Sequence, residues 1–407
     1  MSETADHFAT MLMLMGLVSL LAVPIRAGFS RVFMPDMIGF ILFGAALSIG
    51  SALTGFAVDT LNEQVPLLAK IGIVVLLFRV GLESNLGKLR RQLGRAALIW
   101  LSDISVAAAT VFVLVLFWPG LGLIPALFAG IAASATSIGV SAGVWEEAGA
   151  LNSDSGALLL DVAELDDVSA VVLLSVLFAV GPLLNLPEGP AILAPALKAG
   201  AIQLSLMVVF SIGCYLFSRW LEKPLSDSFA KFSPQHGPIV FATGAVFMIA
   251  ATAEFMGLSM AIGALFAGLA FSRDPAERNI DDAFEILLTV FGPFFFVAIG
   301  LSVDTTVLIG GMGLAAALAG MALIGKLLGA GLPAAAMLGW RRGALIGVSM
   351  VPRAEIFLLV MLFGLTLGPW AVPQVLYNAA VLTSIVTCMI APAVVGLMLR
   401  RGRKEVA

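Results

Sequence analysis

The sequence has few charged residues and few of the side chains that usually carry chemistry. Lysine, arginine, aspartate and glutamate make up 12% of the 407 residues, whereas they approach about a quarter of a soluble globular protein. Two cysteines and two histidines argue against a disulfide framework and against thiolate or imidazole metal sites. No nucleophile elbow, metal-ligand spacing or phosphate loop occurs. We therefore expect neither an enzyme nor a resident cofactor, and no nucleic-acid partner.

Apolar side chains take the place of the missing charge. They form 60% of the chain, and the mean hydropathy is +1.07. Apolar runs of roughly 20 residues, the length that crosses a bilayer, recur throughout. We expect an all-α polytopic protein in contact with membrane lipids. Its thirteen transmembrane helices are predicted at residues 8–26, 35–54, 66–84, 94–118, 122–147, 155–181, 190–220, 237–254, 258–272, 285–303, 306–338, 342–366 and 372–399.

Basic residues fix the expected orientation of these helices. Every basic cluster follows an odd-numbered helix, from Arg26 and Arg31 after the first to Arg400 and Arg401 after the last. Cytoplasmic loops attract lysine and arginine. We therefore expect a multi-pass protein of the cell (inner) membrane, with its amino terminus outside and its carboxyl terminus in the cytoplasm.

Thirteen helices divide into two halves of six around a linker. Residues 1–189 hold helices 1–6, residues 190–236 hold linker helix 7 and a cytoplasmic loop, and residues 237–407 hold helices 8–13. An odd number of membrane crossings separates equivalent helices of the two halves. The second half is therefore inverted relative to the first, as in many transporters built from inverted repeats. The equivalent helices 5 and 12 carry helix-breaking sequences, Thr-Ser-Ile-Gly at 136–139 and Pro352. We expect two broken helices at one depth.

Two adjacent carboxylates, Asp166 and Asp167, stand in the apolar run 155–181. Ionisable groups at this depth are costly, and they commonly mark ion pathways or proton relays. Asp167 lies about 18 Å from the cytoplasmic end of its helix, near the membrane midplane. Because the two carboxylates repel each other, at least one is expected to have a raised proton affinity, and the pair can hold either a cation or a proton.

Other polar residues are predicted at the same depth. Thr136 and Ser137 offer oxygen ligands, although such hydroxyls often bond carbonyls of their own helix. Lys326 is expected to compensate the aspartates, with a salt bridge of no transport role as the alternative. Asp161 and Glu164 share a helix face with Asp167. They form either a cation entry path or, for Asp161, a contact with headgroups.

Two further ion pairs are expected. Arg353 and Glu355 flank the break at Pro352, and we interpret them as a structural pair that supports the broken helix. Arg79 and Asp103 lie at mirrored positions across the hairpin of helices 3 and 4. We expect them to pair with each other, which would place Arg79 outside the ion site.

Eight segments in order along the chain resemble those of a known transporter family. They are Pro-Asp-Met-Ile-Gly (35–39), LLFRVGLES (76–84), ATSIG (135–139), ELDDV (164–168), GLSMAIGALFAGL (257–269), FFFVAIGL (294–301), GKLLG (325–329) and PRAE (352–355). The chain resembles the monovalent cation:proton antiporter-2 branch of the cation/proton antiporter superfamily, which includes NapA-type sodium/proton antiporters. The resemblance implies crossing broken helices in a mobile core domain, a dimerisation domain and a homodimer.

The resemblance also implies roles for single residues. Asp167 corresponds to the principal carrier of cation and proton, and Lys326 to the lysine of electrogenic exchangers. The expected function is Na⁺/H⁺ antiport by elevator-type alternating access, with Li⁺ and K⁺ as alternative cargo. A K⁺/H⁺ antiporter or Kef-type potassium efflux system is one alternative function. A sodium-coupled organic-anion symporter on a related inverted-repeat fold is another.

Overall fold

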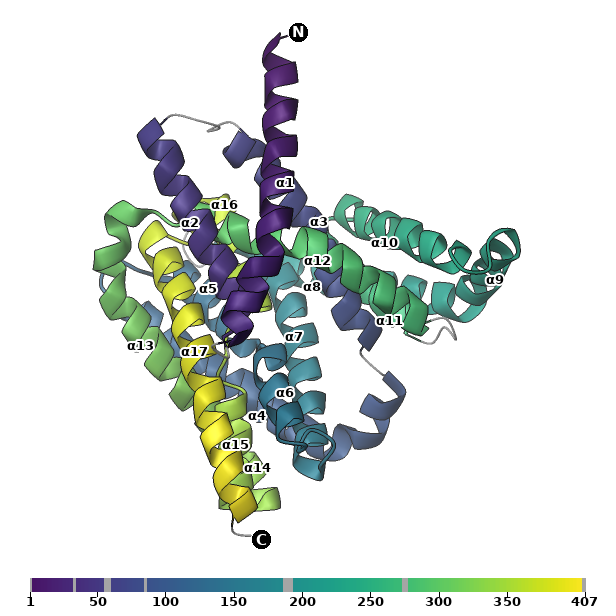
Figure 1. Cartoon of the computed structure of the whole chain (residues 1–407). Helices are drawn as coiled ribbons and strands as arrows, with labels where there is room; N and C mark the ends of the chain where they lie inside the picture. The colour runs from purple at the N-terminus through teal and green to yellow at the C-terminus, as the bar shows by residue number, and fades with distance from the viewer. Residues whose placement is uncertain are drawn as a thin grey trace. The chain divides into compact units, whose positions relative to one another are not determined.

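The computed structural model describes residues 2–31, 34–54, 60–83, 86–185, 193–272 and 277–404. Within these ranges every regular element is a helix (Figure 1). Eleven helices are long and apolar enough to cross a membrane, and two shorter apolar helices, Met260–Phe271 and Glu355–Leu367, accompany them. These helices confirm an all-α polytopic membrane protein. The count of thirteen spans stays a prediction.

The chain forms two compact units, and each takes segments from both halves of the sequence. Unit 1 contains Met1–Leu86 and Leu197–Ser302, and unit 2 contains Gly87–Ala196 and Val303–Ala407. This division is the one expected if each of two inverted repeats contributes segments to both units. The repeat boundaries at residues 189 and 237 stay a prediction.

Unit 1 is a helical assembly in which α3 packs against α11 and α12, and α2 packs against α12. Its elements are α1 (Ser2–Arg31), α2 (Asp36–Thr54), a π turn (Thr60–Gln64), α3 (Val65–Glu83), α8 (Leu193–Leu216), α9 (Lys223–Phe232), α10 (Gly237–Phe255), α11 (Met260–Phe271) and α12 (Glu277–Leu301).

Glycines allow these helices to meet backbone to backbone. A Cβ on Gly44 of α2 would lie 2.2 Å from the Val297 carbonyl oxygen of α12, and one on Gly268 of α11 would lie 2.1 Å from the Phe78 carbonyl oxygen of α3. Small residues at membrane-helix interfaces permit this close approach. Several glycines of the recognised sequence segments therefore serve packing within unit 1.

Residues 221–232 were expected in a loop, and the structure corrects this. α8 continues through a π turn (Phe217–Glu222) into α9. Pro224 stands in the first turn of α9, where a missing backbone N–H is tolerated. The Phe229 ring lies 5.2 Å from the Phe241 ring of α10. This aromatic contact packs α9 against α10 and stabilises a helix that sequence periodicity did not separate from the loop.

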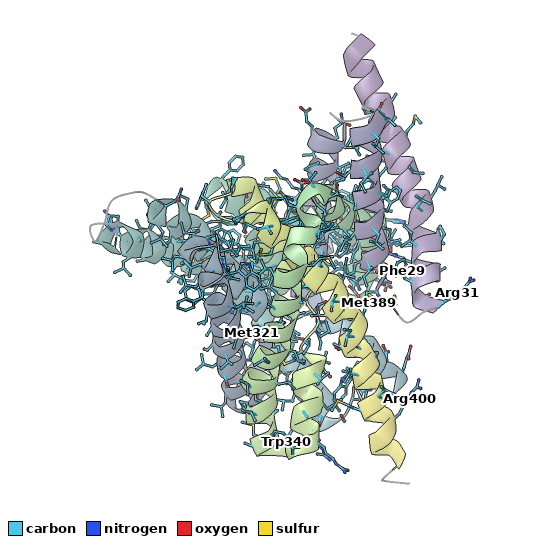
Figure 2. All side chains as sticks on the ribbon, turned by 90° about the vertical axis from the view of Figure 1, so that its left-hand side faces the viewer. Phe29, Arg31, Met321, Trp340, Met389 and Arg400 are labelled. Carbon is cyan, nitrogen blue, oxygen red and sulfur yellow. The ribbon has the colours of Figure 1, made fainter. Side chains whose placement is uncertain are left out.

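Unit 2 contains the two broken helices. Its elements are α4 (Leu86–Leu116), α5 (Leu123–Ser134), α6 (Ile138–Glu147), α7 (Asp154–Leu184), a 3₁₀ turn (Thr305–Val307), α13 (Leu308–Lys326), a π turn (Leu327–Gly331), α14 (Leu332–Leu338), α15 (Trp340–Ser349), α16 (Glu355–Leu367) and α17 (Gln374–Lys404). Figure 2 shows Trp340 and Arg400 toward the same end of this unit.

Both predicted helix breaks are confirmed. The chain between α5 and α6 is extended at Ala135 and Ser137, and residues 351–354 between α15 and α16 are not helical. A core around Trp145 packs beside these breaks. The Trp145 indole N–H donates to the Ser349 hydroxyl at 2.8 Å. This bond ties the end of α6 to the end of α15.

Candidate ion-exchange site

The two helix breaks are joined directly by hydrogen bonds. The Ser137 backbone N–H donates to the Pro352 carbonyl at 3.0 Å, and the Arg353 guanidinium donates to the Ala135 carbonyl at 2.6 Å. The Ser137 hydroxyl donates to Glu355 at 2.6 Å. A broken helix leaves backbone groups without helical partners. Here each break supplies partners for the other, which places Thr136 and Ser137 at their crossing.

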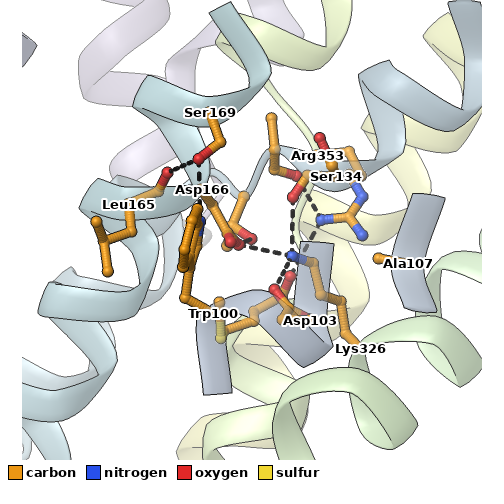
Figure 3. Close-up of polar contacts among 12 residues, drawn as sticks. Trp100, Asp103, Ala107, Ser134, Leu165, Asp166, Ser169, Lys326 and Arg353 are labelled. Atoms are coloured by element: carbon orange, nitrogen blue, oxygen red, sulfur yellow. Dashed lines mark hydrogen bonds and ion pairs between the residues drawn. The ribbon is translucent and has the colours of Figure 1, made fainter. Parts of the chain in front are cut away.

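Asp166 projects from α7 to this crossing. Its Oδ2 accepts the Thr136 hydroxyl at 2.9 Å and the Lys326 ammonium at 2.8 Å. Asp166 and Lys326 are both fully buried. Figure 3 shows the lysine reaching across from α13 toward Asp166, with Ser134 and Arg353 beside them. The predicted association of Asp166, Thr136 and Lys326 is therefore present in the structure.

Asp103 of α4 belongs to the same cluster, although we expected it to pair with Arg79. The Lys326 ammonium bonds Asp103 as well as Asp166, and it donates to the Ser134 carbonyl at 3.0 Å. Arg79 pairs instead with Asp281 of α12 at 2.8 Å. The expectation was wrong because equal depth in adjacent helices does not decide which way two side chains point. A carboxylate inside an apolar run was the available signal for Asp103.

Asp167 has surroundings different from those of Asp166. Its side chain is half-buried, and its carboxylate lies beside the backbone of Thr136. Its charged neighbours are Asp166, Glu355 and Lys326. Asp161 is buried and Glu164 is half-buried on the same helix. Asp161, Glu164 and Asp167 are spaced to share one face of the unbroken α7. Their use as a cation entry path stays a prediction.

Arg353 and Glu355 do not form the expected pair. Arg353 donates through Nη1 to the Ala135 and Met350 carbonyls, while Glu355 accepts the Ser137 hydroxyl. Both side chains thus contact the break between α5 and α6, and Arg353 also contacts the end of α15. The extended backbone at the break turns the two side chains toward different partners, so they support the crossing separately.

Several carboxylate oxygens in the cluster lack hydrogen-bond donors. Among the described residues, Oδ1 of Asp103, of Asp166 and of Asp167 is buried without a hydrogen-bond partner. Buried polar atoms are normally satisfied. The Thr136 and Ser137 hydroxyls donate their protons to carboxylates, which leaves lone pairs on both hydroxyl oxygens. Unpaired carboxylate oxygens and free lone pairs are ligands that hard cations prefer.

Charge in the cluster is unequal. It contains the carboxylates of Asp103, Asp166, Asp167 and Glu355 and the cationic groups of Lys326 and Arg353. If every group is ionised, the carboxylates exceed the cations by two. A buried excess of negative charge is costly. Protons or monovalent cations would reduce that cost, so the arrangement can bind either.

A known protein family matches most of the chain. Residues 17–401 match the family described as transmembrane sodium/hydrogen exchangers. The chain belongs to this family. The family is one of transporters, and its match confirms the membership in the cation/proton antiporter superfamily that the sequence segments indicated. Assignment to the NapA-type branch stays a prediction.

Relatives in this family resemble most of the chain. The high-affinity Na⁺/H⁺ antiporter NhaS3 of Synechocystis sp. is 29% identical, with 90% of this chain and 78% of that protein covered. The Na⁺/H⁺-K⁺ antiporter GerN of Bacillus cereus is 28% identical, with 89% of each covered. The solved structure of the sodium proton antiporter MjNhaP1 from Methanocaldococcus jannaschii has a TM-score of 0.72 at 16% identity and covers 97% of this chain and 99% of that one. The last comparison shows a shared fold.

Proposed function

We propose that the chain is a secondary antiporter that exchanges H⁺ for Na⁺ across the cell membrane. The observation that carries this proposal is the buried contact of Asp166 with Lys326 and Thr136, beside two crossing helix breaks. Membership of the sodium/hydrogen exchanger family supports it. In this proposal the exchanged ions are cargo, and no cofactor takes part.

Asp166 and Asp167 alternate between two occupants. Without cation, Asp166 pairs with Lys326 and Asp167 carries a proton. A cation that enters from the cytoplasm takes the place of Lys326 at Asp166 and also binds the Asp167 carboxylate, with the Thr136 and Ser137 hydroxyl oxygens replacing part of its hydration shell. The proton leaves in exchange. Asp161 and Glu164 extend negative charge from the cytoplasmic end of α7 toward Asp167 and attract the cation.

The two units suggest how access alternates. The aspartates, Lys326 and both helix breaks all belong to unit 2, so they can move as one body. We propose elevator-type movement of unit 2, with unit 1 forming the contact between two copies of the chain. In this arrangement the amino terminus is outside and the carboxyl terminus is cytoplasmic.

Lys326 bears on whether exchange moves net charge. If two protons are exchanged for each Na⁺, the membrane potential contributes about 2.3 kcal/mol per net charge at 100 mV. That contribution would drive Na⁺ out against its gradient. We propose electrogenic exchange: with Lys326 charged and paired to Asp166, the cluster still has two carboxylates more than cationic groups, so it can hold a second proton besides that of Asp167 and release both when the cation binds.

Potassium is the second candidate cargo. The name of GerN includes K⁺ beside Na⁺, and carboxylate and hydroxyl oxygens accept either ion. By contrast, the Lys326 contact with two buried carboxylates gives no support to an organic-anion symporter.

Exchange by the purified chain tests these alternatives. Proteoliposomes with a trapped pH indicator would receive an outward proton gradient and then Na⁺, Li⁺ or K⁺. We expect Na⁺ to dissipate the gradient at lower concentration than K⁺, and an imposed membrane potential to change the rate. Dissipation by K⁺ alone would favour the K⁺/H⁺ alternative, whereas no cation-dependent flux would contradict antiport.

A further inference from the structure

Asp103 has no part in the exchange step proposed above, yet it lies inside the buried cluster. Its side chain is fully buried, one carboxylate oxygen contacts the Lys326 ammonium, and the other has no hydrogen-bond partner in the described structure. It comes from α4, whereas Asp166 comes from α7. Lys326 therefore contacts two carboxylates, although one would balance its charge.

The Lys326 ammonium has three N–H donors, and three acceptors surround it. They are Asp103, Asp166 at 2.8 Å and the Ser134 carbonyl at 3.0 Å. A cation that takes Asp166 removes one of the three. With Asp166 as its single anionic partner, the ammonium would then be buried against a carbonyl without a counter-charge, which is strongly unfavourable. Asp103 lets it keep a carboxylate.

Helix packing keeps Asp103 beside Lys326. A Cβ on Gly329 would lie 2.8 Å from the Asp103 Cα, and one on Gly325 would lie 3.0 Å from the Ala107 Cα. α4 therefore meets the end of α13 and the π turn after it at backbone contact, on both sides of Lys326 in sequence. This contact holds the segment of α4 that bears Asp103 against the segment of α13 that bears Lys326.

We propose that Asp103 is a positioning residue that retains the Lys326 ammonium when a cation takes Asp166. The inference rests on the proposed function and adds a role for a residue outside the ion-binding set. Asp103 balances the lysine charge, so the charges of Asp166 and Asp167 stay available to the cation. Without Asp103, Lys326 and the cation compete for the same Asp166 oxygen.

Asp103→Asn is the direct test, because asparagine keeps the shape and removes the charge. In proteoliposomes we expect the KM for Na⁺ to rise about tenfold, while the maximal rate changes less than about twofold. Asp103→Glu keeps the carboxylate and should restore a KM nearer that of the wild type. The matched control is Asp281→Asn, which breaks the Arg79 pair of unit 1 and should leave the KM unchanged. If Asp103→Asn does not yield folded protein, Asp103→Ser replaces it with the same expected shift.

A double variant separates action through Lys326 from a structural role. Na⁺ binding is measured by the Na⁺-dependent rise in the unfolding temperature, which requires no transport. In the Lys326→Gln background, Asp103→Asn should change the half-maximal Na⁺ concentration less than about threefold, because no ammonium is left to retain. An equal shift in both backgrounds would overturn the inference.

The outcomes distinguish this inference from the proposed function. A wild-type chain that exchanges Na⁺ while Asp103→Asn keeps a wild-type KM overturns the role of Asp103 alone. Loss of maximal rate with unchanged KM does the same, since it makes Asp103 a structural residue. A wild-type chain with neither Na⁺-dependent flux nor Na⁺-dependent stabilisation overturns the proposed function and the inference with it.

Discussion

Asp166 and Asp167 are neighbours in the chain, but the fold gives them different partners. Successive side chains of a helix point about 100° apart. Asp166 therefore faces Lys326 and Thr136 and is fully buried, whereas Asp167 is half-buried beside the backbone of Thr136. The difference suits a division of roles in which Asp166 holds the lysine and Asp167 carries the proton.

Replacement of Lys326 should lower the stability of the protein. Lys326→Gln leaves Asp103 and Asp166 buried without their shared cation, and removal of one partner from a buried ion pair costs about 3–5 kcal/mol. We expect a clear fall in the unfolding temperature of detergent-purified protein. Lys70→Gln, at an exposed position of α3, is the control and should not change it. An unfolding temperature equal to that of the wild type would mean that Lys326 does not balance these carboxylates.

The Thr136 hydroxyl should matter through its oxygen. Thr136→Val keeps the side-chain shape and removes the bond to Asp166, a hydrogen bond to a charged group worth about 1.5–3 kcal/mol. We expect its KM for Na⁺ to rise about tenfold or more. Thr136→Ser retains the hydroxyl and serves as the matched variant. Equal KM values for the two variants would exclude the hydroxyl as a ligand.

Among the helices, the crossing of α5/α6 with α15/α16 organises the site. Bonds from Ser137 and Arg353 connect one break to the other, while α13 brings Lys326 against α4. The position of the lysine thus depends on backbone contact between α4 and the end of α13. Glycine at residue 329 permits that contact.

Gly329→Ala should disturb this contact. A Cβ at residue 329 would lie 2.8 Å from the Asp103 Cα, so the helices must shift, and overpacking of this kind costs about 1–3 kcal/mol. We expect a lower unfolding temperature and weaker Na⁺ binding. Gly320→Ala lies in α13 with nothing within 4 Å of the added Cβ and should behave as wild type. Identical stability of the two variants would show that the α4–α13 contact tolerates extra volume.

The helix breaks were predictable because their causes are local. Pro352 lacks a backbone N–H, and a Thr-Ser-Ile-Gly run favours a break at membrane depth. The partner of Asp103 was not predictable, because hydropathy gives the depth of a side chain but not the direction in which it points. For the same reason, the sequence did not show that Arg353 and Glu355 would bond to other elements and not to each other. The predicted depth in the membrane was enough to bring Asp166, Thr136 and Lys326 together. The packing of α4 against α13 brings Asp103 to them as well.

For the chain as a whole, the division into units does not follow the sequence halves. Segments before residue 86 and from 197 to 302 form one unit, and the remaining segments form the other. All residues of the candidate site lie in unit 2. Composition predicted a polytopic membrane protein, while the interleaving of the units depends on long-range contacts that hydropathy does not contain.

Cysteine labelling tests the orientation that the basic residues predict. Ser228 of α9 is exposed on the segment expected in the cytoplasm, and Thr305 is exposed between α12 and α13 on the side expected outside. The natural cysteines, Cys214 and Cys388, are buried. A membrane-impermeant maleimide added to intact cells should label Thr305→Cys and spare Ser228→Cys, and everted vesicles should reverse the pattern. Labelling of Ser228→Cys in intact cells would reverse the assigned orientation.

The measurement that bears most directly on the proposed exchange is Na⁺-driven proton flux in proteoliposomes that contain Asp167→Asn. Asparagine preserves the shape of the side chain but cannot release a proton or balance a cation. We predict no Na⁺-dependent flux from a variant that elutes and unfolds like the wild type. Asp154→Asn, at the exposed start of the same helix, should retain flux. Wild-type flux from Asp167→Asn would contradict the assignment of Asp167 as the group that carries proton and cation in turn.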